Sequence, residues 1–364
     1  MNKSIKYRLY PSTLQQELFA KTFGCCRKIW NLMLSDKITH YKQAKEMLVT
    51  TPAQYKKDYP YLKEVDSLAL ANVQIHLQTA YKNFFRDNKV GFPKFKSAKH
   101  NKKSYTTNCI NGNIKLTDSG IKLPKVGIVK AKIHREPNAD WNLKSVTISQ
   151  TSDGKYYASV LFEYEASIVK INNINNIIGL DYKSDGLFMD RDGNICGSPK
   201  FHRKEQKKLA KLQRQLSRKE NDSKNKNKAR LKVAKLHRHI ANQRLDYLHK
   251  KSTEIANQYD CVCVESLNMQ AMSNRGFGNG KATMDNGYGL FLTMLEYKLN
   301  DRGKYFIKVD KWFPSSQICS CCGNKQKLNL QTRIYKCNCG LQIDRDYNAA
   351  INIRNEGIRL LAVA

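Results

Sequence analysis

Three acidic residues lie beside apolar segments, at positions where their carboxylates can meet in a folded chain. Asp181 ends the apolar run 177–180, Glu265 ends the apolar run 261–264, and Asp346 comes just before a predicted C-terminal helix. Carboxylate oxygens are hard ligands that suit Mg²⁺, and a pair of such ions activates water while stabilising a leaving 3′ oxygen. These residue types therefore indicate a centre for metal-dependent hydrolysis of phosphodiester bonds.

The three acids can converge only if the two apolar runs are neighbouring strands of one sheet. An RNase H-like α/β sheet provides this neighbourhood, with the third acid at the start of a helix. Each acid also has an ordinary structural interpretation. Asp346 could be a helix N-cap, Asp181 a turn residue, and Glu265 a surface residue that follows a buried strand.

Five of the eleven cysteines fall between positions 319 and 339. They form two short turns, and four thiolates from two such turns complete a closed tetrahedral sphere of the kind that holds structural Zn²⁺. The predicted ligands are Cys319, Cys322, Cys337 and Cys339, and the second turn is one residue tighter than the usual pattern. Cys321 is left over, and the alternative is two unrelated cysteine pairs. The odd total argues against a disulfide framework in an intracellular chain.

The chain carries 64 Lys or Arg against 31 acidic residues, a net charge of +33. A solubilising surface needs a net charge of only about 2 to 8. A polyphosphate partner relieves the self-repulsion and releases counterions, which favours nucleic acid over an anionic membrane. The sequence contains no apolar run of about 18 residues and no signal-peptide h-region at its start. We therefore expect a soluble, cytoplasmic protein with no membrane partner.

Two apolar stripes predict helices in the N-terminal half. Ser12 and Gln15 have capping-box spacing at the start of the first, and the second covers residues 67–86. The segment 91–96 then alternates aromatic and cationic residues around a proline. It could stack on bases and contact phosphates, or it could be a plain solvated linker.

Short β-type runs separated by turn residues follow from 105 to 165, which suggests a small barrel. The strand predicted over residues 1–10 could complete this barrel, leaving the helices as an insertion. Further on, residues 200–251 hold 19 Lys or Arg and only four acidic residues. Such a one-sided charge favours a helical hairpin that faces phosphates over a merely solvated helical face.

Several motifs resemble those of the TnpB family, the transposon-encoded RNA-guided nucleases related to type V CRISPR nucleases. Residues 178–181, 264–267 and 344–350 resemble its three RuvC-type motifs. Residues 311–317 and the cysteine turns match the family in order, as do residues 7–11 and 91–95 in the N-terminal half. The resemblance covers nearly the whole chain.

The resemblance implies an RNA-guided endonuclease that cleaves double-stranded DNA beside a short target-adjacent motif. Its guide RNA would come from the end of the transposon, and the protein would be bacterial and nucleoid-associated. Asp181, Glu265 and Asp346 would be the Mg²⁺ ligands and catalytic residues, with Asp344 as the substitute if the register of the third motif is wrong.

The resemblance also implies a division of the chain into domains. We expect an α/β RNase H-like (RuvC) nuclease domain with an inserted zinc ribbon, and an N-terminal wedge-type, OB-like β-barrel with a helical recognition insertion. The expected ranges are 1–10 and 105–170 for the barrel, 11–104 for the insertion, 171–314 and 342–364 for the nuclease domain with a basic hairpin at 200–257, and 315–341 for the ribbon.

Two other functions account for part of these observations. A nuclease-inactive RNA-guided DNA-binding repressor would have a broken acidic triad, whereas this chain keeps all three acids. A zinc-containing DNA-binding accessory protein of transposition would explain the charge and the cysteines, but not the triad.

Overall fold

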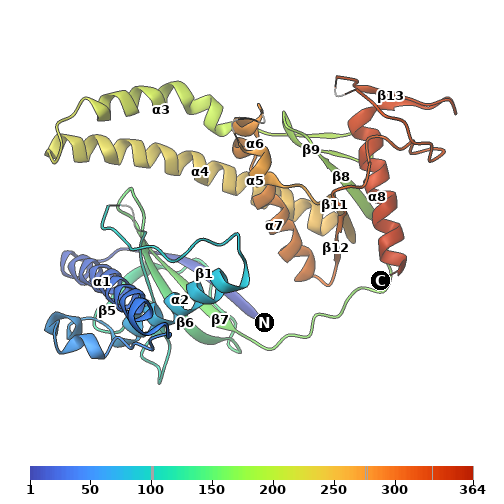
Figure 1. The fold of residues 1–364 in the computed structure, drawn as a ribbon. Helices are drawn as coiled ribbons and strands as arrows, with labels where there is room; N and C mark the ends of the chain where they lie inside the picture. The colour runs from blue at the N-terminus through green and yellow to red at the C-terminus, as the bar shows by residue number, and fades with distance from the viewer. Residues whose placement is uncertain (100–101, 275, 277, 330, 364) are drawn as a thin grey trace. The chain divides into compact units, whose positions relative to one another are not determined.

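The computed structural model describes residues 1–99, 102–274, 276, 278–329 and 331–363 (Figure 1). The chain divides into two compact units, Met1–Ala166 and Ser167–Ala364. Each unit has its own sheet and helices. Within the described residues, no helix is both long enough and apolar enough to cross a membrane.

The first unit contains the two predicted helices. Helix α1 (Thr13–Ala44) begins at Ser12, whose hydroxyl accepts a hydrogen bond from the Gln15 amide while the Gln15 side chain accepts one from the Ser12 amide. The predicted capping box is thus confirmed. Helix α2 (Ser67–Arg86) covers the predicted range and begins at the N-cap Asp66. Two short 3₁₀ helices, η1 (Gln54–Lys56) and η2 (Pro60–Lys63), lie between α1 and α2.

A seven-stranded antiparallel sheet makes up the rest of this unit. In sheet order its strands are β2 (Lys103–Asn108), β6 (Asn142–Gln150), β7 (Tyr156–Glu163), β1 (Asn2–Leu9), β5 (Gly127–Lys132), β4 (Gly120–Leu123) and β3 (Lys115–Thr117). The N-terminal strand β1 joins the sheet between β7 and β5, as predicted. The outer strands β2 and β3 are not paired with each other among the described residues, so the hydrogen-bonded ladder is an open sheet and not the closed barrel expected.

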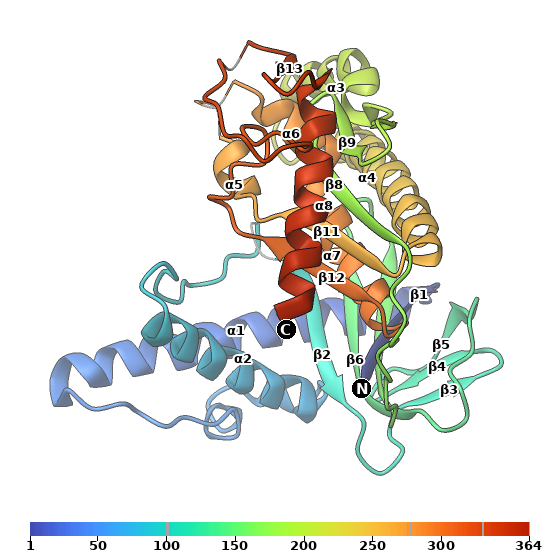
Figure 2. The ribbon, with the colours of Figure 1, turned by 90° about the vertical axis from the view of Figure 1, so that its right-hand side faces the viewer.

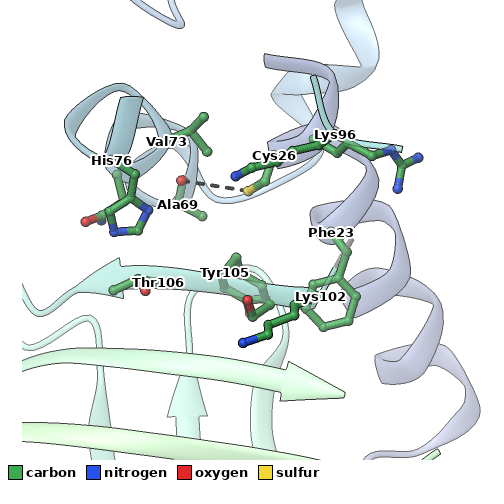
Figure 3. A pocket seen from close by; sticks show the side chains of 12 residues that line it. Phe23, Cys26, Ala69, Val73, His76, Lys96, Lys102, Tyr105 and Thr106 are labelled. Atoms are coloured by element: carbon green, nitrogen blue, oxygen red, sulfur yellow. Dashed lines mark hydrogen bonds between the residues drawn. The ribbon is translucent and has the colours of Figure 1, made fainter. Parts of the chain in front are cut away.

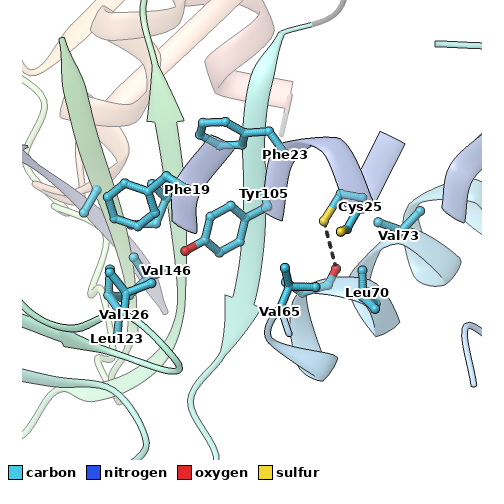
Figure 4. Close-up of a cluster of buried hydrophobic side chains, with 14 of the residues drawn as sticks. Phe19, Phe23, Cys25, Val65, Leu70, Val73, Tyr105, Leu123, Val126 and Val146 are labelled. Carbon is cyan, nitrogen blue, oxygen red and sulfur yellow. Dashed lines mark hydrogen bonds between the residues drawn. The ribbon is translucent and has the colours of Figure 1, made fainter. Parts of the chain in front are cut away.

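The core of the first unit joins α1 to this sheet. Phe19 and Phe23 on α1 lie against the Tyr105 ring on β2, with ring centroids 6.3 and 5.8 Å apart (Figure 4). Burial of each such aromatic side chain stabilises the fold by roughly 1.5–3 kcal/mol. The buried Thr107 hydroxyl on β2 donates to Asp66, which links the start of α2 to the same sheet.

The second unit is built on a mixed five-stranded sheet. In sheet order its strands are β10 (Ile195–Gly197), β9 (Gly186–Asp190), β8 (Ile177–Tyr182), β11 (Cys261–Glu265) and β12 (Tyr305–Val309). Strands β8 and β11 are parallel neighbours, and Leu180 pairs with Val264. This confirms the prediction that the two apolar runs lie side by side, since Asp181 and Glu265 directly follow the paired residues. Cys261 and Cys263 are buried within β11 as small core residues.

Helix α8 (Arg345–Val363) packs on this sheet (Figure 2), and glycines allow a close approach at two positions. A Cβ at Gly179 on β8 would lie 2.1 Å from the Ala350 carbonyl oxygen, and a Cβ at Gly357 would lie 2.1 Å from the Cys263 sulfur. Because glycine has no Cβ, the helix and the strands approach closely. This contact fixes where the N-terminus of α8 meets the end of β8.

The remaining helices and a small ribbon complete the second unit. Helices α3 (Phe201–Ser217) and α4 (Lys224–Gln258) form the basic hairpin, close to its predicted range. Helices α5 (Met269–Met272), α6 (Gly280–Asn286) and α7 (Tyr288–Asn300) follow β11. Strands β13 (Ile334–Lys336) and β14 (Gln342–Asp344) pair as an antiparallel ribbon that leads into α8.

Candidate metal centres

Asp181 lies within strand β8, so the interpretation of this residue as part of a turn is wrong. Burial raises the pKa of its carboxyl well above the usual value, and the nearby carboxylates of Glu265 and Asp346 raise it further. The Lys183 and Arg345 side chains act in the opposite direction. Three segments far apart in the sequence thus bring their acidic side chains into one electrostatically coupled group.

Glu265 ends β11 and is half-buried next to β8. Burial raises its pKa, and a hydrogen bond donated by the Ser315 hydroxyl partly offsets that increase. Ser315 is itself buried, and its carbonyl oxygen accepts a hydrogen bond from the Asn352 side-chain amide on α8 at 2.8 Å. Glu265 is therefore oriented by a serine that α8 holds in place, and it is not a free surface residue.

Asp346 lies in the first turn of α8. Its carboxylate forms a 2.8 Å ion pair with the Lys183 ammonium, and both side chains are less than one-fifth exposed, at 19% and 15%. Desolvation alone would lower the pKa of Lys183, but the hydrogen bond and charge of Asp346 outweigh it, so this pKa is raised. Lys183 is thus a firmly protonated cation within the acidic group.

Asp344 has a different role from Asp346. One of its carboxylate oxygens accepts hydrogen bonds from the amides of Asp346 and Tyr347, at 2.9 and 3.1 Å. This is the bonding of an N-cap, and it satisfies amides at the start of α8 that have no partner within the helix. The N-cap role considered for Asp346 therefore belongs to Asp344, and the Asp346 carboxylate is left to pair with Lys183.

The acidic group fits the donor chemistry of a divalent cation. Its ligand atoms are carboxylate oxygens, and the cations near them are the Lys183 ammonium, which pairs with Asp346, and the Arg345 side chain. Within the described residues, these oxygens do not all lie within 4.8 Å of one another, whereas the four cysteine sulfurs do.

The four predicted cysteines come together as expected. The sulfurs of Cys319, Cys322, Cys337 and Cys339 all lie within 4.8 Å of one another, which rules out two unrelated pairs. The Cys319–Cys339 and Cys322–Cys337 sulfur distances are both 3.6 Å. Cys321 is exposed and stands outside the group, as predicted.

Cys319, in the first cysteine turn, is shifted towards the thiolate form, which is the form that binds metal. Desolvation opposes ionisation of Cys319. The backbone amides of Cys322 and Cys321 and the neighbouring thiols outweigh it and lower the pKa of Cys319 to about 7. A closed set of four sulfurs with such a turn fits structural Zn²⁺.

Three residues beside the acidic group had no predicted role. Lys183 and Ser315 contact Asp346 and Glu265 directly, and the buried Tyr288 hydroxyl is close enough for Asp181 and Glu265 to help raise its pKa. Lys183 follows Asp181 by two residues, and Ser315 lies within the 311–317 motif. These positions in the sequence were the available signal for a role near the acidic group. No spacing rule, however, predicts that Lys183 pairs with Asp346 or that Ser315 bonds to Glu265.

A separate polar pocket of about 260 Å³ lies in the first unit (Figure 3). The residues that line it come from α1, α2, β2 and the segment before β2, and include Arg27, Asn72, His76, Lys96 and Lys102. The 91–96 segment is not a loose linker. The Trp30 indole donates to the Lys94 carbonyl at 3.0 Å, and Asn31 exchanges two hydrogen bonds with the Lys96 backbone.

Three family models match parts of the chain. They are described as "Helix-turn-helix domain" (residues 1–46), "Probable transposase" (159–276) and "Cas12f1-like, TNB domain" (288–353). Over residues 1–46 the structure has strand β1 and the single long helix α1, and not two helices joined by a turn.

Curated relatives align with almost the whole chain. A "Putative RNA-guided DNA endonuclease" of Streptomyces pristinaespiralis is 33% identical over 371 residues, covering 98% of this chain and 90% of that protein. The similarly named InsQ of Escherichia coli K12 is 31% identical over 389 residues, covering 99% and 93%. TnpB-like protein L79 of Acanthamoeba polyphaga mimivirus is 30% identical over 165 residues, covering 43% of this chain and 31% of that protein.

A solved structure shares the fold. The cryo-EM structure of the Cas12f1–sgRNA–target DNA complex aligns with a TM-score of 0.60 and 14% identity, covering 98% of this chain and 99% of Cas12f1. Given the identity above 30% that extends over nearly the full length of these two relatives, the chain belongs to the TnpB family of transposon-encoded RNA-guided endonucleases.

Proposed function

We propose that this protein is a transposon-encoded, RNA-guided endonuclease that cleaves double-stranded DNA by Mg²⁺-dependent hydrolysis, beside a short target-adjacent motif. One observation carries the proposal. Asp181, Glu265 and Asp346 come from three separate segments, and they form one coupled acidic group at the carboxyl ends of β8 and β11. The full-length relatives named as RNA-guided DNA endonucleases support the same conclusion.

Asp181, Glu265 and Asp346 would hold the Mg²⁺. When bound, Mg²⁺ supplies Lewis-acid stabilisation of the phosphate and an activated water. The protein's own contribution is to hold the carboxylates in place. Ser315 orients Glu265, the close packing of α8 on Gly179 positions Asp346, and Asp344 takes over the capping of that helix.

The cysteine group would hold a structural Zn²⁺ and stabilise the ribbon that contains β13 and β14. Four thiolates fill a tetrahedral sphere, so no coordination position is left for a catalytic water. The two strands of this segment are only three residues long, so a bound ion would add to the stabilisation that the buried Tyr335 gives it.

A guide RNA from the transposon end and a target DNA duplex would be the partners, in keeping with the net charge of +33. Within this assembly we assign the basic α3–α4 hairpin to phosphate contacts. We also retain the expected division of the chain and a nucleoid-associated location in bacteria. The ranges are 1–10 and 105–170 (wedge), 11–104 (recognition insertion), 171–314 and 342–364 (RuvC-like nuclease) and 315–341 (zinc ribbon).

The test is to purify the full chain from cells that carry its transposon end and to sequence the co-purified RNA. A duplex that matches the guide segment is then incubated with the complex and Mg²⁺. We expect a discrete RNA and cleavage that requires both Mg²⁺ and the matching sequence. Guided binding without cleavage would instead indicate the repressor function, and the absence of a discrete RNA would contradict guidance altogether.

A further inference from the structure

Trp312 is the most exposed tryptophan of the chain. The residue is 79% exposed, whereas Trp30 is buried and Trp141 is half-buried. An indole offers a large apolar surface, so leaving it in water forgoes a substantial stabilisation by burial. Single exposed apolar side chains are common on proteins. Trp312 therefore needs further observations before a role can be assigned to it.

The backbone around Trp312 is held in a defined turn. The Trp312 amide donates to the Asp310 carboxylate at 2.7 Å, and the Phe313 amide donates to the Asp310 carbonyl at 3.1 Å. The next side chain, Phe313, packs against the buried cluster that includes Val309 and Ile353. The ring is thus presented to solvent by a segment that is fixed on both sides, which reduces the entropy lost when a partner binds.

This turn lies next to the acidic group. Ser315, three residues after Trp312, donates its hydroxyl hydrogen bond to Glu265. An extended chain advances at most about 3.6 Å per residue, so the Trp312 Cα lies within about 11 Å of the Ser315 Cα. That distance equals about three stacked nucleotides of one DNA strand.

A cation accompanies the ring. The Lys311 ammonium lies 4.7 Å from the Trp312 ring centroid. An exposed aromatic ring beside a cation is the combination that binds single-stranded nucleic acid, because the ring stacks on a base while the cation contacts a phosphate. Exposed tryptophans also occur in protein interfaces, but the adjacent lysine favours an anionic partner such as a nucleotide.

We propose that Trp312 stacks on an unpaired nucleobase of the DNA strand that enters the acidic centre, with Lys311 on a neighbouring phosphate. The identity of that strand as a cleavage substrate rests on the proposed function. Base stacking itself does not, so the two can be tested separately.

The experiment measures tryptophan fluorescence of the full chain as single-stranded DNA is added. Asp181→Ala protein is used so that the DNA stays uncut without a chelator, which would also remove metal from the cysteine group. The probes are a thymidine oligonucleotide of about ten nucleotides and an abasic strand of equal length and charge. We expect the thymidine strand to quench the fluorescence, and the abasic strand to have little effect.

Further substitution of Trp312 by Phe should remove most of that quenching, whereas the matched Trp141→Phe substitution should retain it. Trp312→Ala should weaken binding of a short thymidine strand by about tenfold without lowering the melting temperature. Equal quenching by the abasic strand would indicate charge or a protein partner in place of stacking, and would overturn the proposal. Quenching that persists in Trp312→Phe would overturn it as well.

Discussion

The acidic group and the cysteine group are both suited to metal ions, but the fold assembles them in different ways. The four cysteines lie between positions 319 and 339, on two turns of one short ribbon. The three acids come from β8, β11 and α8, and they meet only because Leu180 pairs with Val264 and α8 packs on Gly179. A local centre can therefore be predicted from spacing, whereas a dispersed centre requires the tertiary structure.

The difference extends to what each centre does. Under the proposed function, the closed set of sulfurs would stabilise a segment, while the set of carboxylates would hold a cation beside the substrate. Substitutions should separate the two, because loss of one centre should affect activity and loss of the other should affect folding.

The largest effect is expected from Asp181→Ala. Loss of a metal ligand forfeits several kcal/mol of transition-state stabilisation, so cleavage should fall by about a thousandfold or more. RNA binding, zinc content and melting temperature should stay close to those of the unaltered protein. Asp192→Ala, in an exposed turn of the same sheet, is the control. Full cleavage by Asp181→Ala, measured on a matching duplex, would refute the mechanism.

Cys319→Ser should have the opposite profile. The zinc content, measured by elemental analysis, should fall to near zero. The melting temperature should fall by about 10 °C, since metal binding is coupled to folding. Cys321→Ser is the matched control, because that thiol is exposed and outside the group. Unchanged zinc content in Cys319→Ser would show that the cysteine assignment is wrong.

The pH dependence of stability should reveal the strained carboxylates. The raised pKa of Asp181 means that, without metal, the folded state binds a proton more tightly than the unfolded state. Stability should therefore fall as pH rises from the ordinary carboxyl pKa of 3.8 through the raised one. Mg²⁺ replaces the proton, so the increase in melting temperature on adding Mg²⁺ should grow with pH over this range. An increase that does not vary with pH, or that persists unchanged in Asp181→Asn, would contradict this coupling.

Ser315→Ala removes the hydrogen bond that orients Glu265, and cleavage should fall by about tenfold. That hydrogen bond lowers the pKa of Glu265, so its loss should also move the acid limb of the pH–rate profile to higher pH. Ser316→Ala, the same substitution one residue along, is the control. A lower rate with an unshifted pH profile would indicate a packing defect and not a loss of orientation.

Asp344→Ala is expected to have the smallest effect. It removes the N-cap of α8, which should cost about 1 kcal/mol and lower the melting temperature by about 2–4 °C. Asp344→Asn, which keeps an N-cap acceptor, should restore most of that loss. Both variants should still cleave DNA, whereas Asp346→Ala should not. Loss of cleavage in Asp344→Asn would mean that Asp344, and not Asp346, is the metal ligand.

Local features were the most predictable from sequence. The Ser12 capping box, the 67–86 helix and the cysteine group depend on residues close together in the chain, and all three are confirmed. The neighbouring strands that end at Asp181 and Glu265 were predicted from their apolar patterns and are also confirmed.

Interactions between residues far apart in the chain were harder to predict from the sequence. The barrel proved to be an open sheet, because short β-type runs indicate strands but not whether the outermost two pair. The contact of Ser315 with Glu265 depends on how a loop after β12 folds back towards β11. Likewise, Asp344 and Asp346 are both acids at a helix start, and only the helix boundary decides which one is the cap.

Gly179 and Gly357 have a consequence for engineering. They allow α8 to pack closely on β8 and β11, so the strands fix the helix at two positions in addition to its bonds with the preceding segment. The ribbon between β12 and α8 should therefore tolerate insertions, because the free energy of closing a loop rises only slowly with its length. A foreign peptide or a longer hairpin inserted there should leave Asp346 where it is, whereas even a methyl group at position 179 would displace it.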